Sequence, residues 1–317
     1  MKLKVAFAAS IALLLPACAT PHAKQPAIAI TVDDLPLHGP TPRGETAVSV
    51  AQGVISALTA EHVPAYGFIN GHWTVDDPAT APVLTMWRAA GLPLGNHGWS
   101  HRHLSEMTPA EFEQEFVRNE PLLQTGSEDW HWFRYPFLDE GQEDKAKRDA
   151  VRAGLRARGL HNGYATVDGS DWYIESLTAD AVKAGKKVDM AVLRDLYVST
   201  MVGAADFADR LSLKTWGRPP AQVIVLHETD IAALFIADLV RALRADGWTI
   251  VTADEAYADP IAKLAPDVQS ANGTLLELAA WEKGVPPPRW YERNDMALAK
   301  RLFTEQVLHE ELPVPTK

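Results

Sequence analysis

The chain has 317 residues, of which 47% are hydrophobic and 22% are charged, the composition of an ordinary globular protein that can bury one large core. Its formal net charge of −11 argues against a nucleic-acid binder and against a protein that sits on anionic lipid through basic patches. No cysteine follows Cys18. The rest of the chain therefore has neither disulfides nor a thiolate metal site, and any metal ligands must be nitrogen and oxygen atoms.

The amino terminus has the pattern of an export signal. Lys2 and Lys4 precede an apolar run over residues 5–15, which is too short for a permanent membrane helix of ~20 residues. The small residue before Cys18 resembles the lipobox of bacterial lipoproteins, so residues 1–18 are predicted to be a lipoprotein signal peptide, with a lipid anchor at the cysteine. The residue after Cys18 favours sorting of the lipoprotein to the outer membrane. An ordinary secretory signal is the alternative.

Strands and helices are predicted to alternate along most of the chain. The apolar, β-branched run over residues 27–32 ends at Asp33 and predicts a buried strand with acids at its carboxyl end. Thr108 and Glu111 form a capping box that opens a helix. Further strands are predicted at 65–69, 132–135, 163–167, 221–226 and 248–251, and further helices at 46–62, 82–90 and 231–246. This alternation predicts parallel strands joined by crossover helices, in either a barrel or an open sheet.

After the signal peptide, the chain divides into three predicted parts. Residues 19–26 form a short tether, and residues 27–258 form the catalytic domain. Within this domain, residues 173–220 interrupt the alternation and are predicted to be two helices inserted between strands. Residues 259–317 are a carboxyl-terminal extension with a charged helix near 298–311, and nothing in this extension suggests chemistry.

Five short segments carry the residues with chemical potential. They supply a paired carboxylate, two imidazoles at metal-ligand spacing, an arginine, a second aspartate and a late histidine, which are the components of metal-assisted hydrolysis. Most of them follow predicted strands, and barrel enzymes keep their active sites at the carboxyl ends of the strands. The segments are Thr31-Val32-Asp33-Asp34, His97-Gly98-Trp99-Ser100-His101, Arg134-Tyr135-Pro136-Phe137, Asp168-Gly169-Ser170-Asp171-Trp172 and Val225-Leu226-His227.

These motifs, in this order, resemble the polysaccharide deacetylase family, also called carbohydrate esterase family 4. The resemblance extends over roughly residues 27–256 and includes the closing stretch 247–255. It implies an α/β fold, a distorted (β/α) TIM-like barrel of parallel strands. It also implies a divalent metal, usually Zn2+, although two histidines and an aspartate also accept Co2+, Mn2+ or Ni2+. The reaction that it implies is the removal of acetyl groups from N-acetylated sugars.

The resemblance assigns a base and a metal site to the first two motifs. Asp33 matches the family's general base and Asp34 its metal-binding aspartate, so that one carboxylate holds the cation while the other takes a proton from water. His97 and His101 match the two metal-binding histidines, and on a helical turn their spacing places both rings on one face. The family usually has serine or threonine where Gly98 stands, a change that removes no ligand.

The resemblance assigns an arginine clamp and a general acid to the later motifs. Arg134 matches the arginine that keeps the base Asp33 ionised and oriented. His227 matches the general acid that protonates the leaving amine, and Asp171 matches the carboxylate that raises the pKa of this histidine. Asp168 completes the motif around Asp171, and its predicted role is to form a turn.

The resemblance also places five residues at the substrate. The oxyanion of the reaction is expected to form against the metal and a backbone amide near Tyr135. Val225 stands where the family usually has leucine, in the pocket that holds the acetyl methyl group. The predicted substrate-binding residues are Tyr135, Pro136, Phe137, Trp172 and Val225.

The predicted function is a metal-dependent deacetylase that hydrolyses N-acetyl groups of a polysaccharide or of peptidoglycan sugars and releases acetate. Its predicted partners are a carbohydrate substrate and the lipid anchor at Cys18, with no nucleic acid. Its predicted location is the cell envelope, as an exported outer-membrane lipoprotein facing the periplasm. Two alternatives stay open: a metal-dependent hydrolase of a small amide on the same barrel, and a non-catalytic envelope protein that binds glycans through its 10 tryptophans.

Overall fold

The computed structural model of the protein describes residues 25–124 and 130–311. The predicted signal peptide, the Cys18 anchor and most of the predicted tether lie outside the described residues. Within those residues, no helix combines the length and the apolar character that a membrane span requires.

Eight parallel strands form one curled sheet, which confirms the predicted distorted (β/α) barrel of parallel strands. Their order across the sheet is β6-β4-β3-β2-β1-β8-β7, and β9 pairs with the start of β1. No pairing joins β6 to β7 in the described part of the chain, so the barrel is open between these strands. The eight strands are β1 (Ala27–Leu35), β2 (Tyr66–Ile69), β3 (Leu94–Asn96), β4 (Trp132–Phe133), β6 (His161–Asn162), β7 (Val167–Asp168), β8 (Gln222–His227) and β9 (Thr249–Val251).

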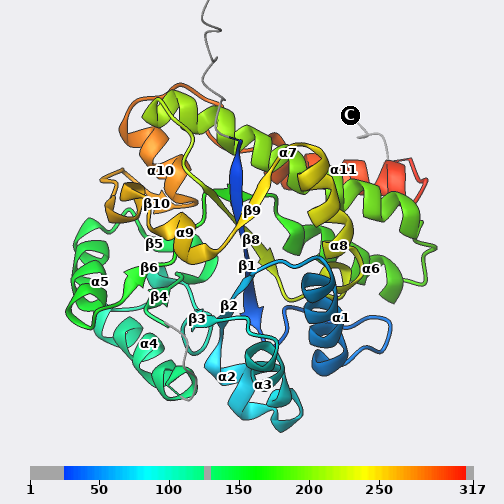
Figure 1. Cartoon of the computed structure of the whole chain (residues 1–317), viewed down its shortest axis with the longest axis horizontal. Coiled ribbons are helices and arrows are strands. Elements are labelled where there is room, and N and C mark those ends of the chain that lie inside the picture. Colours follow the sequence, from blue (N-terminus) through cyan, green and yellow to red (C-terminus); the bar gives the residue numbers. More distant parts are fainter. Residues whose placement is uncertain (1–24, 125–129, 312–317) are drawn as a thin grey trace, which may run out of the picture.

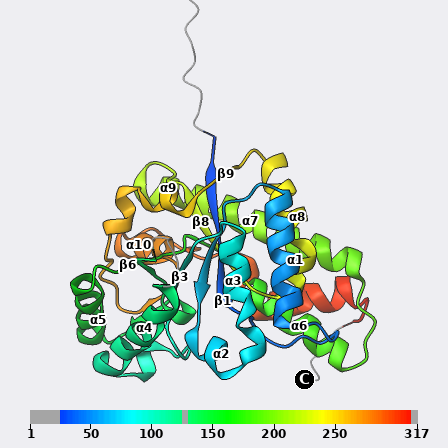
Figure 2. The same cartoon turned by 60° about the horizontal axis from the view of Figure 1, so that its bottom comes forward.

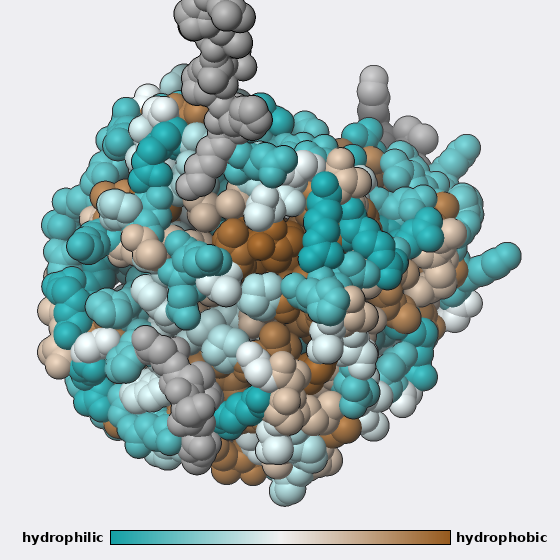
Figure 3. All heavy atoms as spheres, in the orientation of Figure 1, coloured by the Kyte–Doolittle hydropathy of each residue, from teal (hydrophilic) through white to brown (hydrophobic). Residues whose placement is uncertain are grey.

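Helices surround the sheet and connect its strands (Figure 1). Figure 2 shows α1, α3 and α8 on one side of β1, and α4 and α5 on the other. Hydrophilic residues dominate the face in Figure 3, as expected where the outer sides of amphipathic helices meet solvent. The helices are α1 (Ala47–Ala60), α2 (Gly71–Asp76), α3 (Pro82–Ala89), α4 (Pro109–Leu123), α5 (Lys145–Ala157), α6 (Asp171–Lys183), α7 (Met190–Trp216), α8 (Asp230–Ala245), α9 (Ala253–Tyr257), α10 (Leu275–Glu282) and α11 (Met296–Leu302).

Strand β1 is the centre of the fold. Its small and β-branched residues suit a strand that is covered on both faces, and every residue after Ala27 is buried. It pairs with three other strands, β2, β8 and β9. In the β1–β8 pair, Asp33 is in register with His227. The predicted general base and general acid are therefore neighbours across one strand pair.

The connection between β7 and β8 contains two helices, as predicted for residues 173–220. The second of them, α7, contacts both strands and the helix α8. Leu193, Tyr197 and Met201 on its buried face belong to the main hydrophobic core. This long helix is therefore part of the barrel wall.

The predicted strand over residues 163–167 is wrong for its first four residues. Strand pairing occurs before them, in β6, and resumes at Val167 in β7. The carbonyl groups of Gly163 and Tyr164 instead accept hydrogen bonds from the guanidinium of Arg134. These carbonyls therefore serve a buried side chain where the strand pairing is interrupted.

The carboxyl-terminal extension packs into the same body as the barrel. Its short strand β10 (Ala271–Asn272) pairs antiparallel with β5 (Asp139–Gln142), and its helix α10 contacts α7. The predicted final helix near 298–311 begins and ends earlier than expected, because α11 continues only as a π-helical turn, Phe303–Val307. Phe303 and Val307 lie in the main core. Burial of these side chains fixes the turn against the barrel.

Candidate active site

One pocket, of about 400 Å³, lies at the carboxyl ends of the sheet strands. This is where barrel enzymes keep their active sites. Strands β1, β7 and β8 contribute residues near their ends, and the loops after β1, β3, β4 and β7 contribute others. Trp172 comes from α6 and Asn294 from the carboxyl-terminal extension. The lining residues are Asp33, Asp34, His38, His97, His101, Phe137, Leu138, Asp168, Ser170, Trp172, Val225, His227 and Asn294.

Two consecutive aspartates reach this pocket because β1 is irregular near its end. In a regular strand, neighbouring side chains point to opposite faces of the sheet. Asp34 has a left-handed backbone, with φ of 63°, and the register between β1 and β2 shifts between Val32 and Leu35. Such a bulge redirects side chains, and both Asp33 and Asp34 line the cavity. The irregular backbone allows the two carboxylates to act at one site.

Asp34, His97 and His101 are placed to hold a cation together. The Oδ1 atom of Asp34 is buried without a hydrogen-bond partner, 3.3 Å from His97 Nε2 and 3.1 Å from His101 Nε2. The ligand atoms of these residues lie within 4.8 Å of one another. The Nδ1 atom of His97 lies 2.9 Å from the carbonyl oxygen of Arg134; donation to that carbonyl leaves Nε2 as the ligand. Two histidines and one carboxylate suit a catalytic divalent metal such as zinc.

The protonation states of these side chains also suit a metal. Burial opposes the charged form of Asp34, but His101, His38 and His97 outweigh it and hold the pKa of this carboxyl well below its usual range. Burial lowers the pKa of His101 to about 4. An ionised carboxylate and a neutral imidazole are the forms that bind metals.

The two histidine ligands lie on a loop, so the expectation of a helical turn is wrong. Residues 97–101 have no helical structure, and both Gly98 and His101 have left-handed backbones, with φ of 79° and 50°. Glu115 of α4 holds the loop in place, because its Oε2 accepts hydrogen bonds from the N–H and the hydroxyl of Ser100. Glycine suits the positive φ at position 98. The positive φ at this position therefore explains why glycine stands where the family usually has serine or threonine.

Arg134 holds Asp33, as predicted from the third motif. Its Nη1 donates to Asp33 Oδ1 at 3.0 Å and to the hydroxyl of Thr31 at 3.0 Å, and its Nη2 donates to the hydroxyl of Tyr257. The guanidinium is fully buried. A buried, permanently charged partner keeps the neighbouring carboxylate ionised and oriented.

His227 and Asp171, predicted as the general acid and its carboxylate partner, contact each other. Nδ1 of His227 lies 2.7 Å from Asp171 Oδ1, and the backbone N–H of His227 donates to Asp171 Oδ2 at 2.9 Å. Burial opposes a charged ring, but the carboxylates of Asp171, Asp34 and Asp33 outweigh it and raise the pKa of His227 to about 10. The ring is therefore protonated at neutral pH and can donate a proton into the pocket.

His38 is a pocket residue that the sequence analysis missed. Its Nδ1 lies 2.6 Å from Asp34 Oδ2, on the side of the carboxylate opposite to His97 and His101. Asp34, His38 and His227 form a second group whose ligand atoms are close enough to hold a cation. A protonated His227 is a poor metal ligand, so the group with His97 and His101 fits a cation better. The available sequence signal for placing His38 in the pocket was its position, four residues after Asp34.

Three of the five predicted substrate-binding residues line the pocket: Phe137, Trp172 and Val225. The side chains of Tyr135 and Pro136 are not among the lining residues. The Tyr135 ring is buried against Phe112 and Phe133. The ring therefore belongs to a satellite core, which leaves the backbone of Tyr135 for its predicted role at the substrate.

Asp168 has the turn-forming role that its motif predicts. Its Oδ1 accepts a hydrogen bond from the backbone N–H of Ser170 at 2.7 Å, and Ser170 has a left-handed backbone with φ of 53°. Burial raises the pKa of the Asp168 carboxyl. The turn directs the chain from β7 into α6, at whose first turn Asp171 and Trp172 lie.

Asn294 is a second pocket residue that the sequence analysis missed. It comes from the extension, which was expected to carry no chemistry, and it lines the same pocket as Asp33 and His227. Its Nδ2 donates to the carbonyl oxygen of Asp168 at 3.0 Å. No local pattern around Asn294 could have revealed this placement, because only the packing of the extension on the barrel brings it there.

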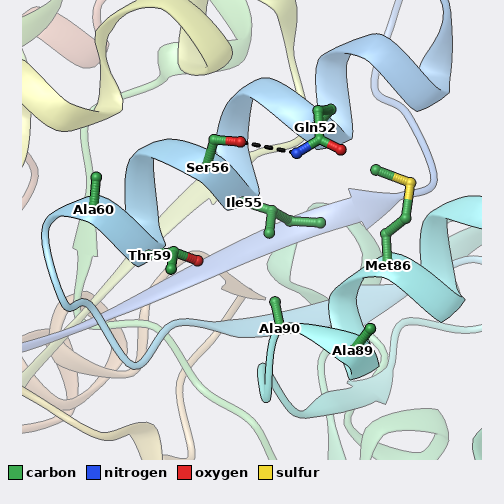
Figure 4. Close-up of a pocket in the computed structure, with 8 residues that line it drawn as sticks. All are labelled: Gln52, Ile55, Ser56, Thr59, Ala60, Met86, Ala89 and Ala90. Atoms are coloured by element: carbon green, nitrogen blue, oxygen red, sulfur yellow. Dashed lines mark hydrogen bonds between the residues drawn. The ribbon is translucent and has the colours of Figure 1, made fainter.

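A second hollow lies between α1 and α3, away from these residues (Figure 4). None of its eight lining residues is charged, and Ile55, Met86 and three alanines are its apolar lining residues. It contains no base, acid or metal-ligating side chain.

Part of the chain matches a protein-family model. Residues 20–158 match the model of a family described as "Polysaccharide deacetylase". This segment, less than half of the chain, contains Asp33, the three residues of the candidate metal site and Arg134. Asp171 and His227 lie beyond it.

The fold resembles those of solved carbohydrate esterase family 4 (CE4) structures. A CE4-family pseudoenzyme from Bacillus anthracis aligns with a TM-score of 0.51 and 14% identity, over 74% of this chain and 66% of that one. A mutant described as a CE4-family pseudoenzyme with restored enzymatic activity aligns with a TM-score of 0.50 and 16% identity, over 74% and 68%. A family 4 carbohydrate esterase from Streptomyces lividans aligns with a TM-score of 0.47 and 18% identity, over 73% and 95%.

At these identities the structural similarity shows the fold alone, and one of the similar structures is a pseudoenzyme. Activity must therefore be argued from the residues of this pocket. The family match covers residues 20–158, and the described chain has a fold like that of the CE4 structures.

Proposed function

We propose that the protein is a metal-dependent deacetylase that hydrolyses N-acetyl groups on sugars of a polysaccharide or of peptidoglycan. The observation that carries the proposal is the arrangement of Asp33 and His227. They are in register across the β1–β8 pair, and both line the pocket that contains the metal-site residues. A base and an acid around one reacting carbon are what amide hydrolysis requires.

Each of these side chains has one task in the reaction. Asp33, held by Arg134, takes a proton from the attacking water. His227, kept protonated by Asp171, donates a proton to the nitrogen as the C–N bond breaks, so that acetate and a free amine leave. A divalent metal bound by Asp34, His97 and His101, most suitably zinc, supplies Lewis acidity toward the acetyl carbonyl and the water.

Aromatic side chains support a sugar as the substrate. Trp172 is 36% exposed and Phe137 is 48% exposed, although both line the pocket. The Phe137 ring stacks on His103, with centroids 3.7 Å apart, and also contacts His101. Exposed rings at a binding site offer flat apolar faces to a sugar ring. The family match of residues 20–158 favours the same substrate class.

The proposed location is the cell envelope. The basic and apolar amino terminus and the position of Cys18 support export and lipid attachment, and hence an outer-membrane lipoprotein that faces the periplasm. In that location, peptidoglycan and exported polysaccharides are accessible acetylated substrates.

Acetate release tests the proposal. Zinc-loaded protein, chelator-treated protein and the Asp33→Asn variant are compared on N-acetylglucosamine oligomers and on peptidoglycan. The exposed Asp180, on α6, provides a matched control variant, Asp180→Asn. We expect release by the zinc-loaded protein and the control only. Metal binding without release on any glycan would instead support the small-amide hydrolase or the non-catalytic glycan-binding protein.

A further inference from the structure

The extension beyond the barrel places a polar side chain in the pocket. Asn294 ends a 3₁₀ turn, Glu292–Asn294, that directly precedes α11. It is the lining residue of the pocket that lies furthest along the chain. The proposed chemistry assigns it no task.

Neighbouring contacts hold this turn on α7. Arg293 Nη1 donates to the hydroxyls of Ser199 and Thr200, at 3.1 Å and 2.9 Å. The Tyr291 hydroxyl lies so close to Gly203 that a Cβ at this position would collide with it. Because the residues before Asn294 are anchored in this way, its side chain has a defined position at the pocket.

Only one end of the Asn294 amide has a partner. Nδ2 donates to the Asp168 carbonyl oxygen, and this bond fixes the orientation of the amide because a carbonyl can only accept. Oδ1 is buried and has no hydrogen-bond partner. An unpartnered buried acceptor is unfavourable in a folded protein and calls for a specific explanation.

We propose that Asn294 is a substrate-binding residue whose Oδ1 accepts a hydrogen bond from a hydroxyl or amide N–H of the acetylated substrate. This inference rests on the proposed deacetylase function and narrows its substrate class. The preferred substrates carry a donor beside the acetyl group, as N-acetylated sugars do. Simple acetyl esters without a donor do not benefit from Asn294.

Two substrates separate this role from a structural one. The zinc-loaded wild type and the Asn294→Ala variant are assayed on N-acetylglucosamine oligomers and on 4-nitrophenyl acetate, which has no hydrogen-bond donor. The exposed Asn272, also in the extension, provides the control variant Asn272→Ala. We expect Asn294→Ala to lower kcat/KM on the oligomers about tenfold, mainly through KM, and to leave the ester reaction unchanged.

The outcomes distinguish the two proposals. An equal loss on both substrates would mean that Asn294 only supports the fold, and it would overturn the substrate-binding role alone. If the variant affects neither substrate, the substrate-binding role is overturned as well. Absence of turnover by the wild type on both substrates would overturn the deacetylase function and the role of Asn294 with it.

Discussion

The side chain of Asp171 binds His227 at two points: Oδ1 lies 2.7 Å from the ring Nδ1, and Oδ2 accepts from the backbone N–H of the same residue at 2.9 Å. This double contact fixes the ring and raises its pKa. The folded-state pKa, about 10, lies above the ordinary value of ~6.5. The stability from this pair is therefore complete below pH ~6.5 and is lost as the pH rises through about 10.

The first prediction concerns the pH dependence of activity. Asp171→Asn removes the main charge that keeps His227 protonated, so the alkaline limb of kcat/KM is expected to move by several pH units toward the ordinary histidine pKa. The rate at mildly alkaline pH should fall by ~10²-fold or more. A pH profile of acetate release, with Asp180→Asn as the control, measures this shift. An unmoved alkaline limb would show that His227 does not act as the acid.

The second prediction concerns metal affinity. His38 holds Asp34 Oδ2, so His38→Ala frees the carboxylate to rotate, and zinc affinity is expected to fall ~10–100-fold. Competition with a chromophoric chelator measures the affinity without any substrate. His72 pairs with Asp76 at the exposed end of α2, and His72→Ala is the matched control. Equal affinity in the wild type and His38→Ala would remove His38 from the metal site.

The third prediction concerns stability. Arg134→Met leaves Asp33 buried without its charged partner, and the free energy of unfolding is expected to fall by ~3–5 kcal/mol. Arg158 forms a more exposed pair with Glu120, so Arg158→Met should cost no more than about 1 kcal/mol. Urea denaturation of both variants measures the difference. Similar losses in the two variants would contradict the central role of Arg134.

The fourth prediction concerns a buried acid next to the site. Burial raises the pKa of Glu228 to about 8, although the Trp87 indole N–H, 3.3 Å away, lowers it. The folded protein therefore binds a proton that the unfolded chain releases, and this residue destabilises the fold progressively as the pH rises from ~4.5 to about 8.

Glu228→Gln removes this titration. We expect its Tm to exceed that of the wild type at about pH 8 by ~2–4 °C or more, with a smaller difference at about pH 5. The exposed Glu113 supplies the control, Glu113→Gln. A Tm difference that does not change with pH would show that Glu228 is ionised in the folded protein.

Much of the fold follows from local sequence patterns. The β-branched run before Asp33 predicts β1, and the capping box at Thr108 and Glu111 predicts the start of α4. Such patterns work because burial on a strand or helix repeats with the period of the element. Residues 163–166 depart from this pattern, and there the carbonyls of Gly163 and Tyr164 accept hydrogen bonds from the Arg134 side chain.

Residue types and their order in the chain predict which side chains carry the chemistry: two adjacent aspartates, two spaced histidines, an arginine, and a later aspartate and histidine. The residue types and their order suffice for that, since the chemistry of each group is intrinsic to it. Tertiary structure alone decided how they meet. The left-handed backbones of Asp34 and His101 aim the ligands, and no hydrophobic pattern encodes them. Asn294 joins the pocket only because the packing of the extension on the barrel brings a distant segment there.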